Sequence, residues 1–229
     1  VMAGDGSAVA GQLGARLREH AQLGVIPFFS SYLEKVLKNS PVKRLAGVLD
    51  WATHKVIAEK LKKQVPPEFD AMIRAFAKGS EIPVDKLYRA YLMPEIFLYI
   101  LGTYHKALGT DHANGLGTPP LFGCTSAITV PPKSETVLHG RNFDYFGVDF
   151  WDRFPTVVFH HPDEGYDYVS ITTAGIIGGG ITSMNAAGLT FAVHQHYPNR
   201  FDLKGVPVGV AGDHVIREAA TIEEAVEIL

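Results

Sequence analysis

The chain has 229 residues, enough for one large domain or two small ones, and its 46% hydrophobic and 20% charged residues are ordinary for a folded protein. A formal net charge of −3 argues against nucleic acid as a partner, and the sequence has no apolar run of about 18 residues that could span a membrane. The single cysteine, Cys124, excludes an internal disulfide and leaves the compartment open, with a secreted or lysosome-like location compatible.

The first half of the chain is predicted to be helical. Apolar residues recur at helical spacing between residues 33 and 52, and Pro66 and Pro67 begin a further helix that Gly79 is expected to end. Residues 109–123 are rich in Gly, Pro and Asn, which predicts a linker. The amphipathic segment 28–61 fits contact with a lipid surface, although packing against a sheet is the favoured interpretation.

The second half is predicted to be mainly β-structure. Residues 126–130 and 136–143 are expected to form a hairpin, and further strands are expected at 156–160, 168–173, 181–184 and 189–194. From residue 213 the pattern becomes helical, with Thr221 and Glu224 spaced as in a capping box. One helix covers only one face of a sheet, so we expect a further segment of this protein to complete the fold.

Cys124 is placed unusually for a packing residue, because it directly follows Gly123 where the predicted linker meets the first strand. Glycine permits strained backbone geometry, and an N-to-S acyl shift followed by hydrolysis of the ester would cut the Gly123–Cys124 bond. The new α-amine, with a pKa of about 7.7–8.0 in model compounds, would act as the base for its own thiol. The alternative is that Cys124 is a small buried hydrophobic residue.

Three other polar residues are candidates for a site around Cys124. A hairpin would bring Arg141 and Asp144 back beside the cysteine, where a guanidinium favours the thiolate and a carboxylate orients the amine. An ion pair at a sheet edge is the structural alternative. Asn185 lies in a predicted turn and is either a turn residue or a donor to the oxyanion of the tetrahedral intermediate.

The order of these motifs resembles the cysteine branch of the N-terminal-nucleophile (Ntn) hydrolases, a group that includes acid ceramidase, N-acylethanolamine acid amidase, the penicillin acyltransferases and the choloylglycine hydrolases. The resemblance covers roughly residues 60–229, and the residues that carry it are Cys124-Thr125-Ser126, Gly140-Arg141-Asn142-Phe143-Asp144-Tyr145 and Met184-Asn185-Ala186-Ala187-Gly188-Leu189.

The resemblance implies an α+β fold, the four-layer α-β-β-α sandwich of Ntn hydrolases, with a C-terminal part beyond this chain. Residues 1–123 would be a helical propeptide or small subunit that stays as a cleaved partner, and 124–229 the first part of the catalytic domain. It also implies an autocatalytically activated amidase that needs no cofactor and no metal. Cys124 would be the nucleophile, and Arg141, Asp144 and Asn185 the other catalytic residues. The substrate would be a small N-acyl amide, with lipid amides favoured by the helical leader.

Other interpretations remain open at this level. The same residues would serve an acyltransferase, a phospholipase B-like ester hydrolase, or an uncleaved relative that binds an acyl ligand without catalysis. His194 and His196 share one face of a predicted strand, which suits a metal, but no third ligand is evident, so sheet or pocket histidines are the favoured interpretation. The aromatic residues Tyr145, Phe150, Trp151 and Phe154 fit either an acyl pocket or an ordinary core.

Overall fold

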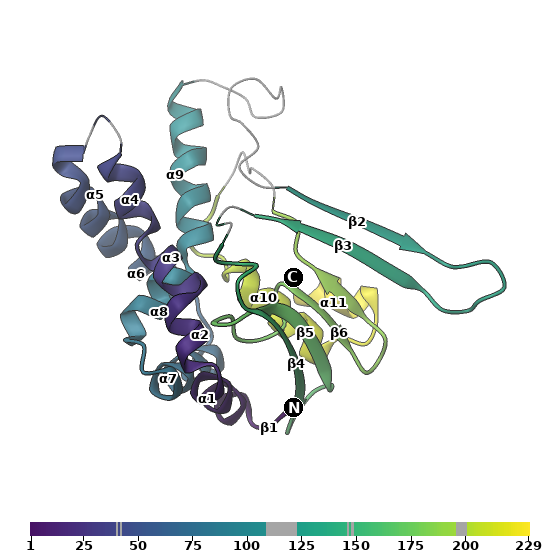
Figure 1. The fold of residues 1–229 in the computed structure, drawn as a ribbon. Helices are drawn as coiled ribbons and strands as arrows, with labels where there is room; N and C mark the ends of the chain where they lie inside the picture. The colour runs from purple at the N-terminus through teal and green to yellow at the C-terminus, as the bar shows by residue number, and fades with distance from the viewer. Residues whose placement is uncertain (40, 42, 109–122, 146, 148, 196–200) are drawn as a thin grey trace.

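The computed structural model describes residues 1–39, 41, 43–108, 123–145, 147, 149–195 and 201–229 (Figure 1). Apart from Gly123, the predicted linker at 109–123 lies outside the described residues. The segment 1–108, called the leader below, contains a strand and a series of helices. These are β1 (Met2–Gly4), α1 (Gly6–Arg16), α2 (Arg18–Leu23), α3 (Val25–Ser30), α4 (Tyr32–Lys38), η1 (Lys43–Leu45), α5 (Ala46–Thr53), η2 (His54–Ala58), α6 (Glu59–Lys62), α7 (Pro67–Ser80), α8 (Val84–Tyr91) and α9 (Met93–Leu108).

The described residues after the leader form strands followed by two helices. The strands are β2 (Gly123–Thr129), β3 (Leu138–Asp144), β4 (Pro155–Pro162), β5 (Tyr168–Thr173), β6 (Thr182–Asn185) and β7 (Thr190–Ala192), and the helices are α10 (Val208–Glu218) and α11 (Ile222–Ile228). The predicted α+β class is therefore confirmed. The capping box is confirmed at the start of α11, where the Thr221 side chain accepts from the backbone N–H of Glu224.

Two sheets are present among the described strands. One has the order β1-β4-β5-β6-β7, and the other is the β2–β3 hairpin, which extends away from the leader in Figure 1. The leader was expected to be helical, yet its β1 pairs in parallel with β4, Met2 lying opposite His160. This pairing fixes the beginning of the leader to the edge of the sheet.

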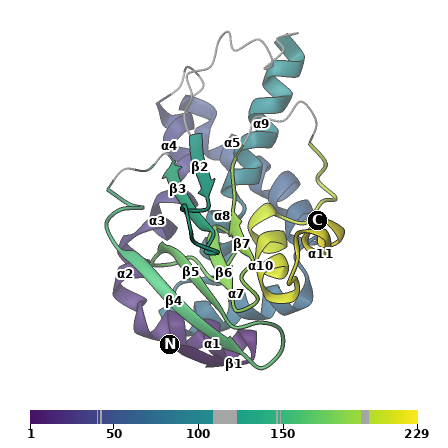
Figure 2. The same ribbon diagram turned by 90° about the vertical axis from the view of Figure 1, so that its right-hand side faces the viewer.

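The five-stranded sheet has a buried face and an open face. Val158 and Tyr168 point into the interior, whereas Val157, Phe159 and Ile171 on the other face are each more than half exposed. Figure 2 shows the strands in front of the leader helices, with α10 and α11 at one side. The structure thus gives helices on one face of this sheet, and the four-layer sandwich stays a prediction.

The leader packs most closely where α1 crosses α7. Gly79 was expected to end a helix, but α7 continues through Ser80, and Glu81 follows it in the left-handed conformation (φ 57°). A side chain at Gly79 would collide with the backbone of Gly11 and Ala15. Gly79 therefore permits close approach of two helices.

Candidate active site at the base of the hairpin

The β2–β3 hairpin brings Cys124 and Arg141 together, as the sequence predicts. Ser126 lies directly opposite Arg141 and Cys124 opposite Phe143, so alternation of side chains places all four on one face. The Arg141 guanidinium donates from Nη2 to the Cys124 Sγ at 3.5 Å. The guanidinium thus lies within hydrogen-bonding distance of the sulfur that the sequence predicts to be the nucleophile.

Arg141 also connects the hairpin to the five-stranded sheet. Its Nη1 donates to the Thr182 hydroxyl and to the Ile181 carbonyl (3.5 Å), and its Nη2 donates to the Val193 carbonyl. The guanidinium carbon also lies 4.5 Å from the centre of the Phe143 ring. Several fixed contacts hold the charge beside Cys124, so the guanidinium is pre-positioned.

Two histidines that each hydrogen-bond a hydroxyl group were not predicted as part of this site. The Ser126 hydroxyl and His194 Nε2 are 2.7 Å apart, and His139 Nδ1 lies 2.9 Å from the Thr190 hydroxyl. The sequence left His194 either as a metal ligand with His196, which lies outside the described residues, or as a sheet or pocket histidine, and it gave no reason to connect His194 with Ser126. Two-residue alternation from Cys124 is the signal that would have placed Ser126 on this face.

Asp144 lies beside the predicted cleavage bond but faces away from the thiol. It pairs across the hairpin with Gly123. Successive side chains of β3 alternate between exposed and half-buried, with Asp144 exposed and Arg141 half-buried. The hairpin therefore places the Asp144 backbone next to the Gly123–Cys124 bond and its carboxylate on the opposite face from Arg141.

Asn185 is not brought to Cys124. Its side chain is 3% exposed, and Nδ2 donates to the carbonyls of Ile216 (3.0 Å) and Ala219 (2.7 Å). Its Oδ1 accepts from the backbone N–H of Leu189 at 3.0 Å. These contacts lie on the helix-covered face of the sheet, opposite the face that Arg141 reaches through Thr182. Both amide hydrogens that an oxyanion donor would use are bonded to the end of α10.

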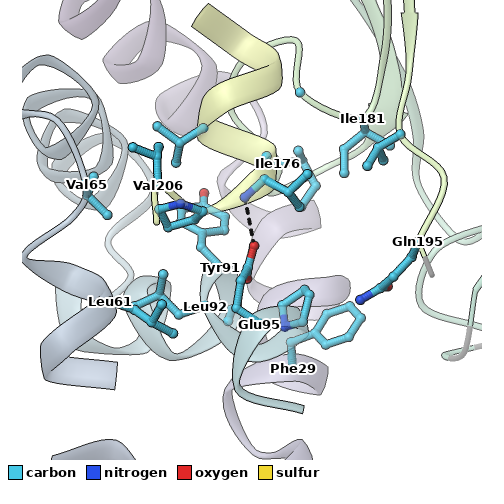
Figure 3. A pocket seen from close by; sticks show the side chains of 18 of the residues that line it. Phe29, Leu61, Val65, Tyr91, Leu92, Glu95, Ile176, Ile181, Gln195 and Val206 are labelled. Atoms are coloured by element: carbon cyan, nitrogen blue, oxygen red, sulfur yellow. Dashed lines mark hydrogen bonds between the residues drawn. The ribbon is translucent and has the colours of Figure 1, made fainter. Parts of the chain in front are cut away.

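An apolar cavity of about 430 Å³ lies between the leader and the sheet (Figure 3). The leader contributes residues of α3, α6, α7, α8 and α9, and the other wall includes Phe143, Ile181, Val193 and Gln195. Phe143 lies opposite Cys124, and Ile181 and Val193 bind Arg141 through their carbonyls, so this wall adjoins the thiol. The volume is in the range of small-molecule sites.

The aromatic residues that the sequence left unassigned divide between cavity and core. Tyr145 and Trp151 line the cavity, and Tyr145 hydrogen-bonds the side chain of Gln195. Phe150 stacks on Phe28 of α3 with ring centres 4.5 Å apart. Burial raises the pKa of Tyr145, so its hydroxyl stays protonated and available as a hydrogen-bond donor.

The apolar cavity is also lined by a carboxylic acid, Glu95 of α9. The sequence gave no reason to single out this residue. The residue is 8% exposed, and Oε1 accepts from the backbone N–H of Val208, the first residue of α10, at 3.0 Å. Burial raises its pKa to about 7. The segment that covers Glu95 is the start of α10, more than a hundred residues further along the chain.

Within the described part of the chain, no helix has both the length and the hydropathy of a membrane span. Among the same residues, no group of three His, Cys, Asp or Glu side chains is arranged to hold a metal ion.

Comparison with known families finds that the C-terminal part of this chain is similar to a family of the Ntn-hydrolase type, whose chemistry is acyl transfer or hydrolysis. Residues 131–229 match the model of the acyl-coenzyme A:6-aminopenicillanic acid acyl-transferase family. The predicted resemblance is thereby confirmed for this segment, which contains Arg141, Asp144 and Asn185 and begins after Cys124. No curated protein matches the chain.

Proposed function

We propose that this protein is an autocatalytically activated cysteine amidohydrolase that cleaves a small, non-peptide N-acyl amide. The observation that carries the proposal is the 3.5 Å contact from the Arg141 guanidinium to the Cys124 thiol beside an apolar cavity. The family match supports acyl chemistry in the same chain.

The proposed activation cuts the chain before Cys124. The thiol attacks the Gly123 carbonyl, the Cys124 amide nitrogen leaves as an amine, and water hydrolyses the resulting thioester. Residues 1–123 become a separate subunit, and the free α-amine of Cys124 becomes available as a base. The backbone of Asp144 lies next to this bond in the hairpin register, and its carboxylate would orient that amine only if the freed chain end turns toward the outer face of the hairpin.

In the proposed catalytic cycle, the α-amine takes the thiol proton and the thiolate attacks the substrate carbonyl. The tetrahedral intermediate collapses to a thioester on Cys124, and the amine product leaves with the proton. Water then attacks the thioester, and the acid product is released. Arg141, which contacts the sulfur, would stabilise the negative charge that develops on it when the thioester is hydrolysed.

Acyl transfer is the second candidate, because the matched family is described as an acyl-transferase. It uses the same acyl-enzyme, with an acceptor amine in place of water. Supplying a soluble amine during turnover separates the two reactions: a transferase converts the acyl group to a new amide, whereas a hydrolase releases free acid at an unchanged rate. Matched ester and amide substrates test an ester-cleaving activity in the same assay.

The experiment that tests activation is intact-mass measurement under denaturing conditions after incubation at mildly acidic and neutral pH. We expect two wild-type fragments that meet at Gly123 and Cys124, and an uncut Cys124→Ala variant. A wild-type chain that stays whole at every pH, while still binding acyl ligands, would indicate a non-catalytic binding protein and would contradict the proposal.

A further inference from the structure

The apolar cavity contains one carboxyl oxygen whose hydrogen-bonding capacity is not used by any described residue. Glu95 Oε1 accepts from the Val208 N–H, but Glu95 Oε2 is buried and has no hydrogen-bond partner in the described part of the chain. Buried polar atoms in folded proteins are nearly always hydrogen-bonded, and an exception requires an explanation. Figure 3 shows the Glu95 side chain among the residues that line the cavity.

Among the described residues, Glu95 forms no ion pair, and its Oε2 has no hydrogen-bond partner. The cavity wall near it is built from residues such as Phe29, Leu61, Leu92 and Ile176, and Tyr91 directs its hydroxyl to the carbonyl of Gly175 at 2.6 Å. Burial raises the pKa of Glu95 to about 7, so below that pH the carboxyl is neutral and carries a proton. A neutral carboxyl can donate through one oxygen or accept through it.

Glu95 is also separate from the reacting atoms. Glu95 and Tyr145 both line the cavity and Cys124 does not, and Tyr145 interacts electrostatically with the Glu95 carboxyl and with the Cys124 thiol. A ligand with its scissile carbonyl at Cys124 would therefore have to extend into the cavity to meet Glu95. The carboxyl is then a recognition group for a distant part of the ligand.

We propose that the cavity binds an acyl chain that carries a hydroxyl group, and that this hydroxyl hydrogen-bonds Oε2 of Glu95. The inference rests on the proposed function for the position of the scissile amide. A hydroxyl fits because it both donates and accepts, so it satisfies the carboxyl in either protonation state. A plain alkyl chain would bury Oε2 without a partner, which costs free energy that a hydroxylated chain recovers.

The test measures binding in the Cys124→Ala background, where no turnover occurs. The probes are hexadecanamide and a set of hexadecanamides with one hydroxyl at successive positions. We expect one position to bind about tenfold or more tightly than the unsubstituted amide, as a buried hydrogen bond predicts. Glu95→Leu should remove this preference while hexadecanamide still binds, and Glu95→Gln, which can also donate and accept, should retain it.

Several results would overturn the inference. The first is equal binding of every isomer by the Cys124→Ala protein, and the second is a preference that survives in Glu95→Leu. The third is tighter binding of a hexadecanamide that carries an amino group in place of the hydroxyl at the favoured position, which would assign a cationic ligand instead. The comparison of isomers stands by itself if Glu95→Leu does not fold. Binding is measured without cleavage. A failure of self-activation in the mass experiment would therefore contradict the proposed function without deciding whether the cavity prefers a hydroxylated chain.

Discussion

Arg141 is the residue on which the proposed chemistry depends most directly. Replacement by Gln keeps hydrogen-bonding capacity but removes the charge next to Cys124. Hydrogen bonds to charged groups contribute about 1.5–3 kcal/mol, so we expect self-cleavage and turnover to slow roughly 10- to 100-fold. Rates from a time course of intact mass check this. Arg153→Gln, at an exposed arginine above the Phe154 ring, is the matched control and should cleave at the wild-type rate.

Glu95 predicts a pH dependence of stability. Burial raises its pKa from an ordinary 4.5 to about 7, so the folded state holds the proton more tightly than the unfolded state. The contribution of the neutral carboxyl to the free energy of unfolding is therefore fully present below about pH 4.5 and is lost as the pH rises through 7. Glu95→Gln should match the wild type at pH 4.5 and exceed its free energy of unfolding by roughly 3 kcal/mol at pH 8. Urea titrations across this range measure it, with exposed Glu135→Gln as a control that shows no such trend.

The burial of Glu95 could not be predicted from its own helix, because its environment comes from α3, α8 and the start of α10. The same holds for Asn185. A Met-Asn-x-x-Gly-Leu turn suggests an oxyanion donor by resemblance, whereas the position of α10 decides what the amide contacts. By contrast, Cys124 and Arg141 belong to one predicted hairpin, and the return of its second strand was enough to predict that they meet, although it did not show that the Asp144 side chain would lie on the other face.

At the scale of elements, Asn185 joins β6 to the last turn of α10. It donates to two carbonyls that the end of the helix would otherwise leave without partners. Asn185→Ala should therefore lower the free energy of unfolding by roughly 2–4 kcal/mol. Chemical denaturation tests this, and exposed Asn142→Ala is the control. An unchanged stability together with lost turnover would instead support the oxyanion role.

The elements themselves were predicted unevenly. The strand at 168–173 is confirmed with its bounds, because a run of aromatic and β-branched residues between turn signals defines it well. The parallel β1 was missed, since a strand of three residues carries almost no periodicity. Gly79 was read as a helix stop because a lone sequence does not reveal that α1 crosses α7 at this glycine.

At the scale of the whole molecule, the leader packs against the rest of the chain through several kinds of contact. The Arg217 guanidinium in α10 donates to Glu68 of α7 at 2.9 Å, Phe29 packs against Trp151 with ring centres 5.7 Å apart, and β1 pairs with β4. The cavity also takes one wall from each. Removal of the leader would expose the apolar residues of that wall and the edge of β4.

We therefore expect the leader to stay bound after the proposed cut. Size-exclusion chromatography of the cleaved protein should give one peak in which both fragments are found by denaturing mass measurement. Cys124→Ala, uncut, should elute at the same volume. If a leader fragment eluted separately under native conditions, the contacts between the leader and the sheet would be too weak to hold the two fragments together, which would contradict this prediction.

The pairing of β1 with β4 has a consequence for how stability is measured. In an uncut chain the leader and the sheet are tethered, so the melting temperature is independent of protein concentration. Once the Gly123–Cys124 bond is broken, unfolding releases two molecules from one, and mass action makes the melting temperature rise with total concentration. The cut that creates the nucleophile would also make the mature protein sensitive to dilution, which the precursor is not.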